Sequence, residues 1–309
     1  MSAIISVDEL ARRIGEPDLR LVDLRWALGQ PDHGRQAYAE GHIPGAIFLD
    51  LETDLSDPAG LGSPGRHPLP DPRTFAARLA GSGIGDTDDV VAYDDAAGTV
   101  AARLWWMLDD LGHERVAVLD GGYRAWLSAG LPVTVEMPAL EPAALHLRDR
   151  WRRVIDRRTL KASLGSVVLL DARAPERYRG EVEPVDPVAG HIPTARSAPA
   201  LASVGPDGRL LGRERLQARY VVLGAATPRA GASAAVSGGP EVVTSCGSGV
   251  NACHHALAMR LAGLPPPLLY AGSYSDWTRS GQPVATGPEP GDPPEPDLPP
   301  RRGPIPYSR

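Results

Sequence analysis

The sequence predicts two tandem α/β domains, each built on a mainly parallel sheet flanked by helices. A chain of 309 residues is long enough for two domains with a core each. Four landmarks recur in the same order at nearly one offset, which indicates an internal duplication. Short apolar runs alternate with amphipathic stretches in both copies, as strands and helices do in α/β proteins.

The repeat defines the domains. Gly-His-Ile-Pro occurs twice, and each copy follows a strand-like segment that ends in an acid. The paired segments are 21–25 and 169–173, 41–44 and 190–193, 90–94 and 242–246, and 122–126 and 273–277. We therefore expect homologous domains over 1–136 and 151–285.

Elements follow from apolar spacing. Residues 116–119 and 242–243 are typical of buried strands, and 101–111 and 252–261 show helical spacing. Prolines mark a linker over 137–150. The proline-rich tail, 286–309, is expected to have no fold of its own, and the Gly/Ala/Ser-rich stretch 224–239 to form a flexible surface loop.

Composition narrows the function classes. A net charge of −6 gives no reason to expect nucleic acid or an anionic membrane as partner. No apolar run is long enough for a membrane helix, and residues 1–10 lack a secretory pattern, so we expect a cytoplasmic protein. Two cysteines, Cys246 and Cys253, are too few for a disulfide framework.

Cys246 lies between a predicted strand and a predicted helix. Gly247 and Gly249 permit a tight curl in which successive N–H groups converge on the sulfur. The helix N-terminus adds positive potential, so the loop should stabilise a thiolate and then a persulfide anion. Cys246 is therefore the predicted nucleophile, whereas Cys253, further into the helix, is expected in the core.

Cys-Gly-Ser-Gly-Val at 246–250 resembles the active-site loop of mercaptopyruvate sulfurtransferases, in the tandem-domain rhodanese family. Segments 171–173, 178–180, 190–193 and 269–277 are similar to that family too. The resemblance implies two rhodanese-like domains, of which the first is inactive because Asp94 replaces the cysteine. It implies sulfur transfer from 3-mercaptopyruvate through a Cys246 persulfide to a thiol, a thioredoxin-like protein or cyanide, without cofactor or metal.

The resemblance also implies roles for other residues. Ser248 would join a proton relay with His67 and Glu52, and Arg179 would bind the donor carboxylate. The loop would be completed by Gly247, Gly249, Val250 and Asn251, the last standing where the family usually has threonine. The family's second substrate arginine has no clear counterpart in 181–186. Exposed residues without a role are the alternative for Arg179, His67 and Glu52.

The residues of the loop also bear on rival functions. Neutral Gly247 and Ser248 favour a monoanionic donor, but thiosulfate stays open, as does a non-catalytic binding module. A thiolate phosphatase needs an arginine six residues after the cysteine, and position 252 is alanine. A metal site of Cys246, Cys253, His254 and His255 matches no familiar zinc spacing. Both histidines are expected to line the helix surface or to cap contacts nearby.

Overall fold

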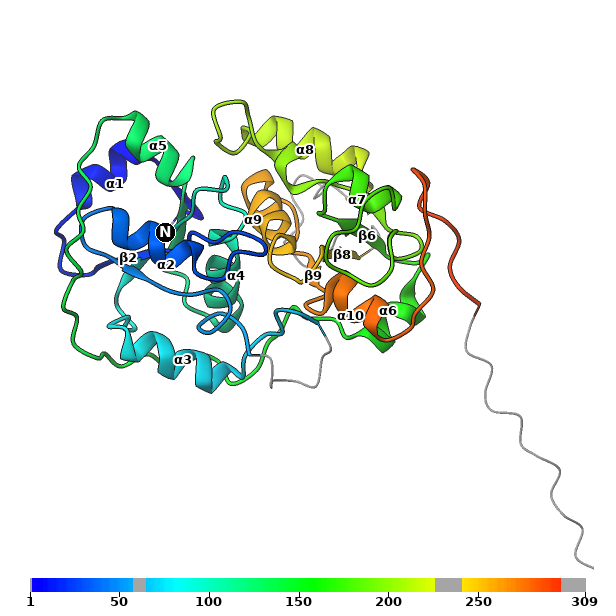
Figure 1. The fold of residues 1–309 in the computed structure, drawn as a ribbon, viewed down its shortest axis with the longest axis horizontal. Coiled ribbons are helices and arrows are strands. Elements are labelled where there is room, and N and C mark those ends of the chain that lie inside the picture. The colour runs from blue at the N-terminus through cyan, green and yellow to red at the C-terminus, as the bar shows by residue number, and fades with distance from the viewer. Residues whose placement is uncertain (1, 58–64, 226–240, 296–309) are drawn as a thin grey trace, which may run out of the picture.

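The computed structural model describes residues 2–57, 65–225 and 241–295. Two α/β units lie side by side, the first drawn in blue to green and the second in green to orange (Figure 1). The predicted loop at 224–239 and the end of the tail lie largely outside the described residues. Within the described ranges, no helix is both long and apolar enough to cross a bilayer.

The first unit has a five-stranded sheet in the order β1-β5-β4-β2-β3, with every pairing parallel. Its central strands are apolar and buried, as expected for strands covered on both faces. The strands are β1 Ile4–Ile5, β2 Leu19–Asp23, β3 Ala46–Phe48, β4 Asp89–Tyr93 and β5 Val116–Leu119. The helices are α1 Val7–Arg13, α2 His33–Glu40, α3 Pro72–Gly81, α4 Ala101–Leu111 and α5 Gly122–Ser128.

The second unit repeats this plan with a four-stranded parallel sheet in the order β7-β6-β8-β9. The strands are β6 Val168–Asp171, β7 Arg196–Ser197, β8 Val242–Ser245 and β9 Leu268–Leu269. The helices are α6 Arg157–Ser163, α7 Pro175–Arg179, the 3₁₀ helix η1 Ala200–Ser203, α8 Arg213–Val222, α9 Ala252–Ala262 and α10 Ser273–Arg279. The predicted α/β class with mainly parallel sheets is confirmed.

The repeated Asp-x-Arg motif ties each sheet to the Gly-His-Ile-Pro segment. Arg25 forms an ion pair with Asp23 and donates to the Gly41 carbonyl at 2.8 Å. Arg173 forms an ion pair with Asp171 and donates to the Gly190 carbonyl at 2.7 Å. Both guanidinium groups are buried and held in ion pairs, so the motif has the same scaffold role in each domain.

The histidine of each Gly-His-Ile-Pro segment is also structural. His42 stacks on Tyr38, and His191 stacks on Tyr178, with ring centroids 3.8 Å apart in both cases. Each of the two ring nitrogens bonds a backbone carbonyl: His42 those of Tyr38 and Glu136, and His191 those of Tyr178 and Glu289. These buried rings are therefore satisfied, which leaves no free nitrogen for chemistry.

The segments between and after the domains are more ordered than expected. The linker 137–150 has no helix or strand, yet Ala143 N–H donates to the Ala80 carbonyl and Arg148 N–H to the Leu111 carbonyl. In the tail, the Glu289 carbonyl bonds His191, and the Pro290 carbonyl accepts from Thr194 N–H. The start of the tail thus packs on the second domain, because its backbone supplies partners for buried groups there.

The helices α4 and α9 pack against each other between the two units (Figure 1). One apolar cluster runs through this contact and includes Trp106 of α4 and Leu257 of α9. Since each helix follows the loop that carries Asp94 or Cys246, the contact fixes the two loops relative to each other. The interface between the domains is therefore part of the framework of the site.

Candidate active site

Cys246 directly follows β8 and forms part of the wall of a cavity of about 350 Å³. Its N–H donates to Ser273 Oγ at 3.0 Å, and its carbonyl accepts from Tyr274 N–H at 3.0 Å. Ser275 N–H donates to the Gly247 carbonyl at 2.9 Å. The start of α10 thus clamps the loop from one side, and the thiol, only 4% exposed, faces a confined space.

Gly249 closes the curl around the sulfur. Its φ is +83°, and a Cβ there would overlap the carbonyl oxygen of Ala271, so only glycine fits. Its N–H donates to Cys246 Sγ at 3.1 Å. We expected several N–H groups around the sulfur, whereas this is the single backbone N–H within hydrogen-bond distance of Sγ in the described chain.

The homologous loop of the first domain shows a filled anion site. The two oxygens of Asp94 accept four backbone N–H groups, from Ala96, Gly98, Val100 and Ala101, each at 2.8 Å. This loop has six residues between Asp94 and α4, one more than the loop between Cys246 and α9. Burial raises the pKa of Asp94, and the four donors oppose that rise.

Asp94→Asn is expected to lower the free energy of unfolding by about 3 kcal/mol, because an amide cannot accept from donors on both sides. Urea denaturation followed by circular dichroism measures the loss. Asp95→Asn is the matched control, because the Asp95 side chain is next in the sequence but 30% exposed. Its free energy of unfolding should stay within about 0.5 kcal/mol of the wild-type value. Equal stabilities for the two variants would contradict this account of the first loop.

Three of the predicted site residues, from both domains, meet beside the Cys246 loop. His67 Nδ1 lies 2.7 Å from Ser248 Oγ, and His67 Nε2 lies 2.9 Å from Glu52 Oε1. Trp26 Nε1 donates to the same glutamate oxygen at 3.1 Å. The bond from His67, together with that from Trp26, lowers the pKa of Glu52. The chain Glu52–His67–Ser248 therefore has the geometry of a proton relay, with a carboxylate that stays ionised at neutral pH.

Two arginines that the sequence reasoning missed lie over Gly247. A Cβ on Gly247 would be 2.8 Å from Arg66 Nη2 and 3.5 Å from Arg177 Nη1, and both arginines line the Cys246 cavity. Arg66 forms an ion pair with Asp186, and Arg177 binds Glu183 at 2.6 Å. Arg173 also lines the cavity and pairs with Asp171, so each of these three guanidinium groups is already paired with a buried carboxylate.

Arg179, the residue predicted to bind the donor carboxylate, does not line this cavity. Its guanidinium binds Glu181 at 2.7 and 2.8 Å on the surface, and it is absent from the residues around Cys246. Both arginines are on the short helix α7, but two residues along a helix turn the side chain to another face. The basic residue directed toward the cysteine is Arg177, and no local pattern distinguished it from Arg179.

The residues of the rival metal site are held separately. Cys253 is fully buried, as expected, and donates to the Gly249 carbonyl at 3.4 Å. His254 and His255 are also fully buried and not on an exposed helix face, because both α4 and α8 cover α9. His255 does contact its neighbours, with ring nitrogens 2.7 Å from the Tyr220 hydroxyl and from the Ala198 carbonyl. Burial lowers the pKa of His254 to about 4 and that of His255 to about 3. Among the described residues, no cluster of three His, Cys, Asp or Glu could hold a metal ion.

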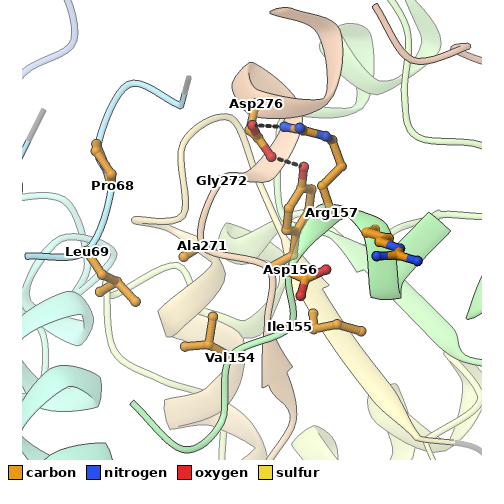
Figure 2. A pocket seen from close by; sticks show the side chains of 11 residues that line it. Pro68, Leu69, Val154, Ile155, Asp156, Arg157, Ala271, Gly272 and Asp276 are labelled. Carbon is orange, nitrogen blue, oxygen red and sulfur yellow. Dashed lines mark hydrogen bonds and ion pairs between the residues drawn. The ribbon is translucent and has the colours of Figure 1, made fainter. Parts of the chain in front are cut away.

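A second cavity of about 350 Å³ lies near the relay but does not include Cys246 (Figure 2). Pro68 and Leu69 form one side, and Val154, Ile155 and Ala271 add apolar surface. Its polar groups partner one another, since Asp276 binds both Arg157 and the hydroxyl of Tyr270. No cysteine, serine or histidine lines this cavity, in contrast to the one that contains Cys246 and Ser248.

A comparison with known families decides the class. The rhodanese-like domain matches this chain twice, at residues 6–129 and 156–280. The chain belongs to the rhodanese family. A Pseudomonas aeruginosa protein named "Probable 3-mercaptopyruvate sulfurtransferase" is 48% identical, over 92% of this chain and 98% of that protein. A Mus musculus protein named "Thiosulfate sulfurtransferase" is 33% identical, over 91% of this chain and 93% of that protein.

Solved structures agree with the tandem arrangement. The "3-mercaptopyruvate sulfurtransferase from Leishmania major" superposes with a TM-score of 0.76 at 29% identity, covering 90% of this chain and 75% of that one. The relatives share sulfur transfer, and this tandem rhodanese is a sulfurtransferase enzyme. Their names divide between two sulfur donors, so the donor has to be argued from the site itself.

Proposed function

We propose that this rhodanese takes sulfur from 3-mercaptopyruvate on Cys246 and passes it from the resulting persulfide to a thiol or cyanide. The observation that carries the proposal is the contrast between the two homologous loops. The terminal sulfur of a Cys246 persulfide lies as many bonds from Cβ as the carboxylate oxygens of Asp94, which accept four N–H groups. A persulfide anion would extend into the equivalent place, beyond the single N–H that now reaches Sγ.

The chemistry balances without an oxidant. The Cys246 thiolate attacks the sulfur of the donor, and the new S–S bond forms as the donor C–S bond breaks. The electron pair of the C–S bond goes to the departing carbon, giving the enolate of pyruvate. The proton lost from the donor thiol ends on that carbon, and Ser248 with His67 is placed to carry it. An acceptor thiolate then attacks the outer sulfur and regenerates the Cys246 thiolate.

The charges of the cavity favour mercaptopyruvate over thiosulfate. Mercaptopyruvate brings one negative carboxylate, which suits the planar fork of a guanidinium. Arg66 and Arg177 are both partly neutralised by Asp186 and Glu183, so the cavity has little surplus positive charge for a dianion. We assign the donor carboxylate to these two arginines, in place of Arg179. Glu52, His67, Ser248 and the 246–251 loop keep their predicted roles in this proposal.

Arg177→Gln is expected to raise KM for 3-mercaptopyruvate about 10- to 100-fold with a smaller effect on kcat, because a charge-assisted bond to the carboxylate is lost. Steady-state formation of pyruvate measures both constants. Arg179→Gln is the matched control, two residues away on the same helix, and should leave both constants within twofold. The reverse result would restore Arg179 as the carboxylate ligand.

The experiment that tests the donor compares 3-mercaptopyruvate and thiosulfate on the wild-type protein, with cyanide as a common acceptor. A higher kcat/KM for 3-mercaptopyruvate supports the proposal. A higher value for thiosulfate would mean that Arg66 and Arg177 act as a dianion site despite their acidic partners, and the protein would be a thiosulfate sulfurtransferase. Absence of turnover and of a persulfide on Cys246 with either donor would favour a binding module.

The acceptor and location follow from the same chemistry. A cavity of about 350 Å³ has room for a small thiol. We propose a cellular thiol or a thioredoxin-like protein as acceptor, with cyanide as a laboratory substitute. A nucleophile that must stay reduced between turnovers agrees with a cytoplasmic setting. Reduced thioredoxin added to the isolated persulfide should release sulfide, and failure to do so would restrict the acceptor to small thiols.

A further inference from the structure

A buried arginine of the first domain reaches the cysteine loop of the second. Arg103, on α4, is fully buried. Its Nη1 donates to the Gly249 carbonyl at 3.1 Å, and its Nη2 donates to the carbonyls of His67 at 3.0 Å and Leu55 at 3.3 Å. One guanidinium therefore joins the residue whose N–H reaches Cys246 Sγ to the backbone of the relay histidine.

The charge of Arg103 distinguishes it from the other basic groups near Cys246. Four basic side chains face the loop from other elements, and each has a carboxylate partner: Arg66 with Asp186, His67 with Glu52, Arg173 with Asp171, and Arg177 with Glu183. Arg103 forms no ion pair with any carboxylate of the described chain, and its Nε has no hydrogen-bond partner there. Cys253 of α9 is the remaining titratable group beside it, and burial raises the pKa of that thiol to about 12.

Burying a cation costs free energy unless a negatively charged group nearby compensates its charge. Burial lowers the pKa of Arg103, while negative charge on Cys253 or Cys246 would oppose that change. Arginine nevertheless stays protonated in proteins. Cys253 remains a neutral thiol at pH 7 because of its raised pKa, so Cys246 is the group that can supply the missing negative charge.

We infer that Arg103 is a positioning residue of the sulfur-transfer site, which fixes the Gly249 turn against His67 and favours the anionic form of Cys246. The inference rests on the proposed role of Cys246 as nucleophile. The first domain, which lacks the cysteine, would then take part in the reaction in two ways. Its helix α4 supplies the positive charge next to Cys246, and its loops supply Glu52 and His67 of the relay.

The test measures the pH dependence of Cys246 alkylation by iodoacetamide, with peptide mapping to separate Cys246 from Cys253. Arg103→Gln is expected to slow the alkylation of Cys246 about tenfold near neutral pH, because the thiolate loses a nearby positive charge. Arg103→Lys should keep the wild-type profile. It should still lower kcat severalfold, because one ammonium cannot span three carbonyls.

His254→Gln is the matched control. His254 is the third residue of α9, as Arg103 is of α4; it is equally buried and lies next to Ala97 of the first domain. Changing it disturbs the same interface without a contact to Gly249, so the alkylation profile should not move. A shift as large as that of Arg103→Gln would overturn the inference, because general loosening of the interface would then be the cause.

A folded Arg103→Gln protein with the wild-type alkylation profile also overturns the inference. If Arg103→Gln does not fold, Arg103→Lys decides. An Arg103→Lys protein that keeps wild-type kcat, measured well below its Tm, overturns the positioning role, and a lowered kcat with an unchanged profile supports it. Alkylation needs no sulfur donor, so this result is independent of whether Cys246 forms a persulfide.

Discussion

Replacing Cys246 by serine is expected to reduce turnover with 3-mercaptopyruvate by about 10⁴-fold or more. A hydroxyl is not ionised at neutral pH and cannot form a persulfide, so the first step has no nucleophile. Serine is otherwise a near-isosteric change, and the backbone bonds of residue 246 to Ser273 and Tyr274 do not involve the side chain. The fold should therefore survive. Pyruvate release and the mass of the protein after reaction with donor measure the loss.

Cys253→Ala is the control for this result. Cys253 is seven residues further on and fully buried, and its thiol donates to the Gly249 carbonyl. Its removal should leave turnover within a few-fold of wild type, although the small cavity will lower Tm. Persulfide found on Cys253, or turnover by Cys246→Ser within tenfold of wild type, would contradict the assignment of the nucleophile.

Local patterns predicted the fold well because the duplication makes each pattern appear twice. The expected helix over 101–111 has the observed bounds of α4, and α9 ends one residue beyond its expected end. Strand and loop spacing located Cys246 between β8 and α9, since an apolar run that stops at a glycine-rich turn is typical of a strand end. The recurring Asp-x-Arg and Gly-His-Ile-Pro motifs marked the repeat correctly, although their roles proved structural.

What the sequence could not predict are contacts between distant parts of the chain. Arg103 and Gly249 are 146 residues apart, and nothing around Arg103 indicates that its charge will be buried against the other domain. His254 and His255 were expected to line the helix surface or cap contacts nearby, but α4 and α8 both pack on α9 and bury them. The sequence resemblance did link His67 and Glu52 with Ser248, and the structure brings their side chains together.

The choice between Arg177 and Arg179 shows a different limit. Both side chains are basic, both follow the same motif, and they stand two residues apart on a five-residue helix. Arg177 differs from Arg179 in that it pairs with Glu183 and Asp186. Where the loop places these two carboxylates is not encoded in residue spacing. The neutral residues of the loop gave an incomplete picture of its charge for the same reason, because Arg66 and Arg177 bring charge to Gly247 from outside the loop.

Breaking the Glu52–His67–Ser248 relay is the second change expected to have a large effect on turnover. His67→Gln is expected to lower kcat about 10²- to 10³-fold with little change in KM. Glutamine still bonds its neighbours but cannot shuttle a proton between Ser248 and Glu52. Glu52→Gln should have a smaller effect, about tenfold, since His67 would keep its bond to Ser248.

His113→Gln is the control for the relay, because His113 is another buried histidine of the first domain, with its ring bonded to the Asp88 carbonyl. It should lower Tm without changing kcat. Single-turnover pyruvate formation locates the defect: a slow first step in His67→Gln means that the relay acts while the C–S bond breaks. A first step at the wild-type rate would place its role in transfer to the acceptor instead, and wild-type kcat would remove the relay from the mechanism.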